Sequence, residues 1–77
     1  MTSGRRTPEI AMPMPPSPRE LRCLHLLAHG SSPKEIAYDL DLKVVSVDLY
    51  LSRVRAKLNA KSLPHAVFLA SQQGLLR

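Results

Sequence analysis

The residues best suited to do chemistry are the basic side chains of segment 43–61. Five basic residues stand there against the single acidic Asp48, namely Lys43, Arg53, Arg55, Lys57 and Lys61. Lysine and arginine bind nucleic-acid phosphates by displacing their counterions. The whole chain has a net charge of +5, which favours nucleic acid or another acidic surface as partner. The same charges can also be the solvated end of an ordinary amphipathic helix, and their number alone does not decide.

Other kinds of chemistry find little support. His25 and His29 have a spacing at which two helical side chains can bind one metal ion, but no third ligand accompanies them. The single Cys23 excludes an internal disulfide and favours a reducing cytoplasm. No nucleophile is paired with a base, and 77 residues are too few for a deep pocket. We therefore expect no enzyme, no metal and no cofactor.

The basic segment overlaps an amphipathic helix that we expect from Leu42 to Leu58. An apolar stripe recurs at helical spacing through Val47, Leu51, Val54 and Leu58. The other face mixes apolar, small and charged side chains, which are Val45, Asp48, Leu49, Ser52, Arg53 and Ala56. We expect the stripe to enter a small core and the mixed face to be presented to a polyanion.

Two shorter helices precede it, each with the same start signal. Ser17-Pro18-Arg19-Glu20 and Ser32-Pro33-Lys34-Glu35 both have the capping-box spacing, with proline at the first helical position. The first helix should end at Gly30. Its expected inward side chains are Leu21, Leu24, Leu27 and Ala28, and those of the second helix are Ile36, Ala37 and Leu40.

The order of the elements predicts an all-α, four-helix domain over 17–77. The segment 41–43 is long enough only for a tight turn, with Leu42 as its apolar plug, so a short helix, a turn and a long basic helix follow one another. This order is the helix-turn-helix arrangement. Ser62 should cap a fourth helix that ends at Gly74. In that helix Phe68 lies on a different face from Val67, so it belongs either to the core or to a contact with a second copy.

The segment 1–16 reads as a disordered, proline-rich tail. Pro8, Pro13, Pro15 and Pro16 deny backbone donors, and the residues between them have no apolar periodicity. The chain has neither a signal peptide nor a stretch of about 18 apolar residues, so we expect no membrane association.

From Ser17 to about Leu76 the chain resembles the DNA-binding domain of the LuxR/FixJ/GerE type of bacterial transcription regulators. The motifs that carry the resemblance are SPREL, LLAHG, SPKEIAYDLDL and VRAKLNAKSLPHAV. The resemblance implies that the third helix enters the major groove of DNA and that the fourth forms a homodimer. It also implies a cytoplasmic, nucleoid-associated protein. Without a receiver or ligand-binding domain, we expect either a free-standing regulator or a domain that interferes with a larger regulator by pairing.

The resemblance, together with the charges, assigns residues to this interface. Phosphate contacts are expected from Ser32, Lys34, Ser46, Arg53 and Lys57, and base contacts from Asp48, Leu49 and Ser52. Val45, Tyr50, Arg55 and Lys61 complete the expected DNA-binding surface. The expected dimer contacts are Val67, Phe68, Leu69 and Ala70.

Two positions depart from the family pattern. A lysine is usual where this chain has Asp48, which would place a negative charge toward phosphates. Lys43 stands where a capping serine or threonine is usual, so the third helix should begin less securely. Asp48 keeps one alternative open, a protein-interaction module that binds or antagonises another transcription regulator or RNA polymerase. A domain like region 4 of a sigma factor shares the fold and is a third, lesser alternative.

Overall fold

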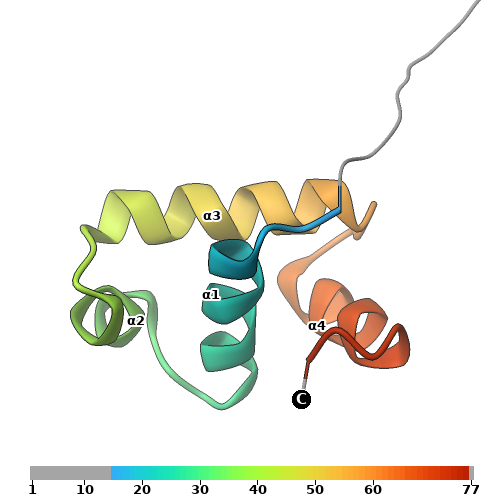
Figure 1. The fold of residues 1–77 in the computed structure, drawn as a ribbon, viewed down its shortest axis with the longest axis horizontal. Helices are drawn as coiled ribbons and strands as arrows, with labels where there is room; N and C mark the ends of the chain where they lie inside the picture. Colours follow the sequence, from blue (N-terminus) through green and yellow to red (C-terminus); the bar gives the residue numbers. More distant parts are fainter. Residues whose placement is uncertain (1–14, 77) are drawn as a thin grey trace, which may run out of the picture.

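The computed structural model describes residues 15–76 and contains four helices (Figure 1). Their bounds are α1 Pro18–Ala28, α2 Pro33–Leu40, α3 Val44–Lys57 and α4 Leu63–Gln72. No strand occurs within 15–76, so the expected all-α, four-helix fold is confirmed. No helix in that range is long and apolar enough to cross a membrane. The expected tail over 1–16 lies outside the described residues except for Pro15 and Pro16.

Side-chain caps begin three of the four helices. Ser17 Oγ accepts a hydrogen bond from the Glu20 amide at 3.2 Å, and the Ser17 amide donates to Glu20 Oε1 at 2.9 Å. Ser32 and Glu35 repeat this reciprocal pair in α2, at 3.2 and 2.7 Å. The expected capping boxes are therefore confirmed. Ser62 caps α4, whereas Lys43 gives α3 no side-chain cap, as its residue type predicts.

All four helices end in the same way. Gly30, Asp41, Asn59 and Gly74 have positive φ angles of 96°, 55°, 56° and 73°. After each of them the chain turns back, and the next amide donates to a carbonyl five residues earlier, as the Ser31 amide does to the Leu26 carbonyl at 3.1 Å. This Schellman pattern satisfies carbonyls that the helix itself leaves unpaired. Glycine meets no Cβ penalty in this conformation, and asparagine and aspartate tolerate it better than other residues do.

The helices pack around one core, with α3 along one side of the molecule and the other three on its inner side (Figure 1). α1 lies between α2 and α4 and touches all three other helices, whereas α2 and α4 do not touch within the described chain. The core consists of Cys23, Leu24, Ile36, Ala37, Val47, Leu51, Val54, Ala60, Ala66 and Ala70. Leu42 packs against this core, as expected of the plug in the turn.

One expected core residue is wrong. Ala28 is exposed at the end of α1, and Cys23 is fully buried in its place. Leu24 is buried and Leu27 packs against the core at partial exposure, so the inward stripe itself is confirmed. Ala28 thus lies outside the core although Leu26 and Leu27, directly before it, pack against the core. Burial also raises the pKa of the Cys23 thiol.

Ala37→Leu tests the close packing of α2. Ala37 is buried, so a larger side chain must displace its neighbours, at a cost of about 1–3 kcal/mol. Each kcal/mol lowers the Tm of a domain this small by about 4–8 °C. Circular dichroism melts should show this loss for Ala37→Leu and little change for the control Ala28→Leu, which adds the same atoms at an exposed site. Equal melts for Ala37→Leu and the unchanged chain would contradict this packing.

Candidate nucleic-acid interface

α3 has one face in the core and the opposite face in solvent. Val47, Leu51 and Val54 are buried, as their spacing predicts. The expected mixed face is exposed at every position, from Val45 through Asp48, Leu49, Ser52 and Arg53 to Ala56. Its apolar side chains are also exposed to solvent, with 70% of the surface of Val45 and 48% of that of Leu49 accessible. A regular face about four turns long, with apolar, polar and basic groups, has the dimensions of an element that enters a major groove.

Two further expected contacts lie on the flank of this face. Ser46 and Tyr50 are half-buried, and the ring of Tyr50 packs against the core. The packed ring limits how far Tyr50 can turn, so only its outer edge is available to a ligand. The structure thus brings Ser46 and Tyr50 to the border of the exposed face and not to its centre.

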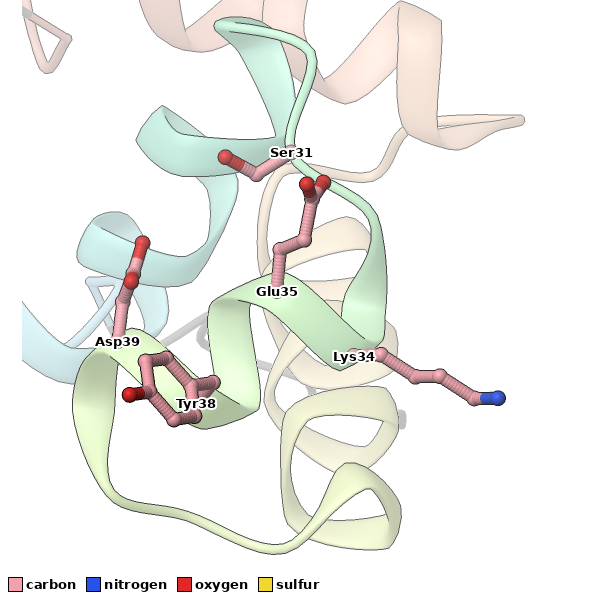
Figure 2. Close-up of a pocket in the computed structure, with 5 residues that line it drawn as sticks. All are labelled: Ser31, Lys34, Glu35, Tyr38 and Asp39. Atoms are coloured by element: carbon pink, nitrogen blue, oxygen red, sulfur yellow. The ribbon is translucent and has the colours of Figure 1, made fainter.

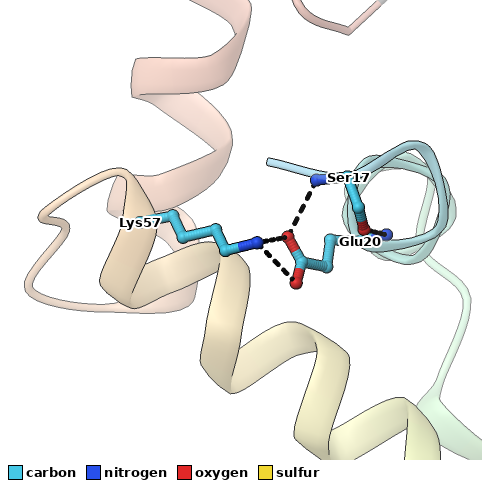
Figure 3. A network of polar contacts seen from close by, with 3 residues as sticks. All are labelled: Ser17, Glu20 and Lys57. Atoms are coloured by element: carbon cyan, nitrogen blue, oxygen red, sulfur yellow. Dashed lines mark hydrogen bonds and ion pairs between the residues drawn. The ribbon is translucent and has the colours of Figure 1, made fainter. Parts of the chain in front are cut away.

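A buried carboxylate in α1 binds the last residue of α3. Glu20 is 3% exposed, and Lys57 Nζ lies 2.9 Å from its Oε1 and 3.1 Å from its Oε2 (Figure 3). The Ser17 amide donates to the same carboxylate, so Glu20 serves the helix cap and the ion pair together. A buried charge without a partner is strongly unfavourable. Lys57 is therefore bound within the fold, although the sequence had suggested it as a phosphate contact.

The surroundings of Glu20 determine its protonation. Burial raises the pKa of this carboxyl group, but the Ser17 hydrogen bond and the nearby Lys57 and Arg53 charges together hold the pKa below its ordinary value. The group thus remains ionised at neutral pH. Its charge is therefore available to Lys57 at neutral pH.

A second basic residue is also used inside the fold. Arg55 Nη1 donates to the carbonyl of Ala60 at 3.1 Å, and the Ala60 amide in turn donates to the carbonyl of Arg55 at 3.0 Å. These two bonds close the turn between α3 and α4 against the end of α3. Arg55 is half-buried there, so much of its hydrogen-bonding capacity is already taken.

The remaining expected cations are free to meet a ligand. Lys34, Lys43, Arg53 and Lys61 are exposed, and none of them makes a side-chain hydrogen bond or ion pair within residues 15–76. Ser32 is exposed at the start of α2, where its Oγ accepts from the Glu35 amide and its own proton stays available. Of these cations, Arg53 lies on the exposed face of α3 and Lys43 directly precedes the helix.

The expected dimer residues of α4 differ in exposure. Phe68 is 59% exposed, and Val67 and Leu69 are half-buried. Ala70 is fully buried in the core of the single chain. The apolar surface that α4 offers to another molecule is therefore centred on Phe68.

His25 and His29 lie close together at the end of α1. The ring centroids of His25 and His29 lie 4.4 Å apart, with the ring planes tilted by 52°. No group of three or more possible ligands from histidine, cysteine, aspartate and glutamate occurs within residues 15–76.

Sequence reasoning missed the second role of Glu20. It placed Glu20 in the helix cap and Lys57 on a phosphate, although the two lie 37 residues apart. The sequence could have predicted the burial of Glu20, because Glu20, Leu24 and Leu27 are spaced to lie on one inward stripe of α1. An acidic residue on such a stripe requires a cation from another element.

Glu20→Gln tests the ion pair through its pH dependence. The pKa of Glu20 is lower in the folded chain than in the unfolded one, so its stabilising contribution is complete above the ordinary glutamate pKa of about 4.3. That contribution is lost as the pH falls through the lowered folded value. At pH 7 the variant should lose about 1–3 kcal/mol, and its Tm should converge with that of the unchanged chain on acidification.

Glu35→Gln is the matched control, because it removes the same charge from an exposed capping box that has no lysine partner. It should lower the Tm much less than Glu20→Gln does. Equal losses for the two variants, or a difference that persists at low pH, would show that the ion pair does not stabilise the fold.

Comparison with known proteins identifies the family. The family described as "Bacterial regulatory proteins, luxR family" matches residues 14–70. The transcriptional regulatory protein FixJ of Rhizobium meliloti (strain 1021) is 43% identical over 58 residues, which cover 75% of this chain and 28% of FixJ. The transcription regulator BvgA of Bordetella pertussis is 44% identical over 59 residues, which cover 77% of this chain and 28% of BvgA.

A third relative, the oxygen regulatory protein NreC of Staphylococcus carnosus, is 42% identical over 60 residues, which cover 78% of this chain and 28% of NreC. The chain thus spans little more than a quarter of the length of these relatives. The family match covers most of the chain, including all of α1, α2 and α3. The chain therefore belongs to the luxR family of bacterial regulatory proteins, and it is a helix-turn-helix, DNA-binding domain of a transcription regulator and not an enzyme.

Proposed function

We propose that the chain is a sequence-specific regulator that binds DNA as a homodimer and inserts α3 into the major groove. The observation that carries this proposal is the division of α3 into a buried face and a fully exposed one. An exposed helix face of this length, next to a second helix joined by a tight turn, is the geometry that helix-turn-helix proteins use on DNA. The activity belongs in the bacterial cytoplasm, where the chromosome lies.

The exposed groups divide into two classes of contact. Arg53, Lys34 and Lys61 supply the sequence-independent attraction to phosphates, with Ser32 and Ser46 as neutral hydrogen-bond donors. At the centre of the exposed face, Asp48, Leu49 and Ser52 meet base edges. A carboxylate accepts from cytosine N4, and an apolar side chain such as Val45 packs on a thymine methyl group. Asp48 thus favours selectivity at some expense of affinity.

Lys57 and Arg55 contribute to this surface indirectly. Lys57 is bound by Glu20 and Arg55 by the Ala60 carbonyl, so both hold the end of α3 in place. Each still adds positive charge near the duplex, but neither is free to form a close phosphate contact without breaking a bond within the fold. Arg53 is therefore the principal phosphate contact of α3.

The homodimer rests on α4. Phe68 is the largest exposed apolar side chain of that helix, and half-buried Val67 and Leu69 border it. Two copies that pair through this helix would present two α3 faces to successive half-sites of one duplex. Pairing would also remove the Phe68 ring from water.

Arg53→Ala and Lys57→Met separate a DNA contact from a structural residue. Arg53→Ala should weaken binding to specific and random duplexes alike and lower the salt slope by about one unit or less. Its Tm should fall only slightly, because the Arg53 charge is the weakest of the influences that lower the pKa of Glu20. Lys57→Met keeps the aliphatic stem but leaves Glu20 without its cation, so it should lower the Tm and change the salt slope less. Duplex titrations at two salt concentrations and thermal melts measure both effects.

Asp48→Lys tests whether the exposed face of α3 binds DNA or a protein. On DNA this variant should bind random duplexes more tightly and discriminate less, because a repulsion is replaced by an attraction. If the unchanged chain binds no duplex at low salt and only Asp48→Lys does, the exposed face of α3 is a protein-interaction surface and the DNA proposal is wrong.

Phe68→Ser tests the dimer. The unchanged chain should sediment as a dimer at high micromolar concentration or on a duplex with two half-sites, and the variant should remain a monomer in both cases. Leu49→Ser is the control for the free chain, since it removes an exposed apolar side chain from α3 and should leave the dimer intact in the absence of DNA. A chain that stays monomeric with and without DNA would disprove pairing through α4.

A further inference from the structure

Tyr38 is a large aromatic side chain that neither the fold nor the proposed DNA surface uses. It projects from α2 with 88% of its surface accessible, the highest value among the large exposed apolar side chains of the described chain. Its hydroxyl group makes no hydrogen bond within residues 15–76. Together with Ser31, Lys34, Glu35 and Asp39 it lines an open depression of about 380 Å³ (Figure 2).

The charges beside Tyr38 are arranged in two rows along α2. Residues four apart share one side of a helix, so Lys34 stands in line with Tyr38, and Glu35 stands in line with Asp39. Figure 2 shows Lys34 pointing away from both carboxylates. One side of the tyrosine is thus acidic and the other basic. We call Glu35, Tyr38 and Asp39 the α2 surface.

The acidity of the α2 surface stands out in a basic protein. The exposed carboxylates of residues 15–76 are Glu35, Asp39, Asp41 and Asp48, and three of these four lie within 35–41. The Asp39 carboxylate makes no hydrogen bond or ion pair in that range. Glu35 uses Oε1 for the Ser32 amide and keeps its second oxygen. Phosphates would repel this group of charges, so the α2 surface is unsuited to DNA.

An aromatic face flanked by carboxylates suits one kind of ligand. An arginine guanidinium stacks on an aromatic ring while its N–H groups donate to a carboxylate. Lysine offers only a compact, strongly hydrated charge, so arginine fits the α2 surface better. The complementary partner is therefore a protein surface that presents arginine.

We infer that the α2 surface docks an arginine-bearing surface of a second DNA-bound protein. This inference rests on the proposed DNA binding for the position of its partner. Ser32 and Lys34 at the start of the same helix belong to the proposed phosphate contacts, so the α2 surface borders the duplex. A protein bound to the adjoining stretch of DNA must itself carry basic side chains to neutralise phosphates. Its basic flank would meet Tyr38, Glu35 and Asp39 directly.

The test is an NMR titration of the full, isotope-labelled chain with a short helical peptide that carries arginines on one face. The matched probes are the same peptide with lysine and with glutamate in place of arginine. The arginine peptide should shift the amides of residues 34–41 first and bind more tightly than the lysine peptide. Because the chain as a whole is positively charged, diffuse attraction does not explain such localised binding of a cationic peptide.

Variants of the chain identify the side chains that bind the arginine peptide. Tyr38→Ala should weaken binding of the arginine peptide by about two- to fivefold, which is what an exposed cation–π contact is worth. Asp39→Asn should also weaken it, whereas the control Asp48→Asn removes an exposed carboxylate of α3 and should not. Tyr38→Ala should leave the Tm unchanged, because its ring makes little contact with the fold.

Several outcomes would overturn the inference. Equal affinity for the arginine and glutamate peptides, or shifts away from 34–41, would show that the α2 surface does not select arginine. A tenfold loss of duplex affinity in Tyr38→Ala would assign the ring to DNA. Self-association that disappears in Tyr38→Ala would assign the surface to a second copy. Failure to bind any duplex would refute the proposed function, while localised arginine binding would still establish the α2 surface.

Discussion

The Glu20–Lys57 ion pair connects the start of α1 to the end of α3, and the orientation of the proposed DNA-binding helix depends on it. The carboxylate is almost completely buried and its two oxygens lie 2.9 and 3.1 Å from the ammonium nitrogen. Such a pair adds little stability over apolar packing, but breaking it leaves a buried charge unpaired, so it strongly disfavours other arrangements of the two helices. Packing of Val47, Leu51 and Val54 fixes the rotation of α3. The remaining face must point outward.

Local signals in the sequence were enough to predict the helices. Ser17 and Ser32 with their glutamates, and Ser62 before Pro64, mark three starts, because a serine oxygen satisfies an amide that the helix leaves unpaired. Gly30 and Gly74 mark two ends, because only a residue that tolerates positive φ reverses the chain there. These features depend on neighbours within five residues. The apolar spacing in α3 then identified its buried face, since one helix covers one stripe of core.

Contacts between segments that are distant in the sequence could not be predicted from such local signals. Arg55 and Lys57 appear in the sequence as parts of a basic run, yet one binds the Ala60 carbonyl and the other binds Glu20. A basic side chain can pair with a phosphate or with a buried carboxylate, and only the fold determines which of the two lies within reach. The burial of Cys23 and the exposure of Ala28 are a second example, because the spacing of residues shows which side of α1 is apolar but not how far each residue on that side enters the core. The sequence likewise did not show that Tyr38 is exposed, because its exposure depends on which elements pack against α2.

The central claim is that the outer face of α3 meets DNA, and amide chemical-shift mapping with a short duplex tests it most directly. Labelled chain titrated with duplex at low salt should show its largest shifts at residues 45–53 of α3 and 32–34 at the start of α2. The shifts should diminish as salt rises, because phosphate contacts release counterions. Shifts centred on α4 or on residues 35–39, with α3 unaffected, would contradict the account.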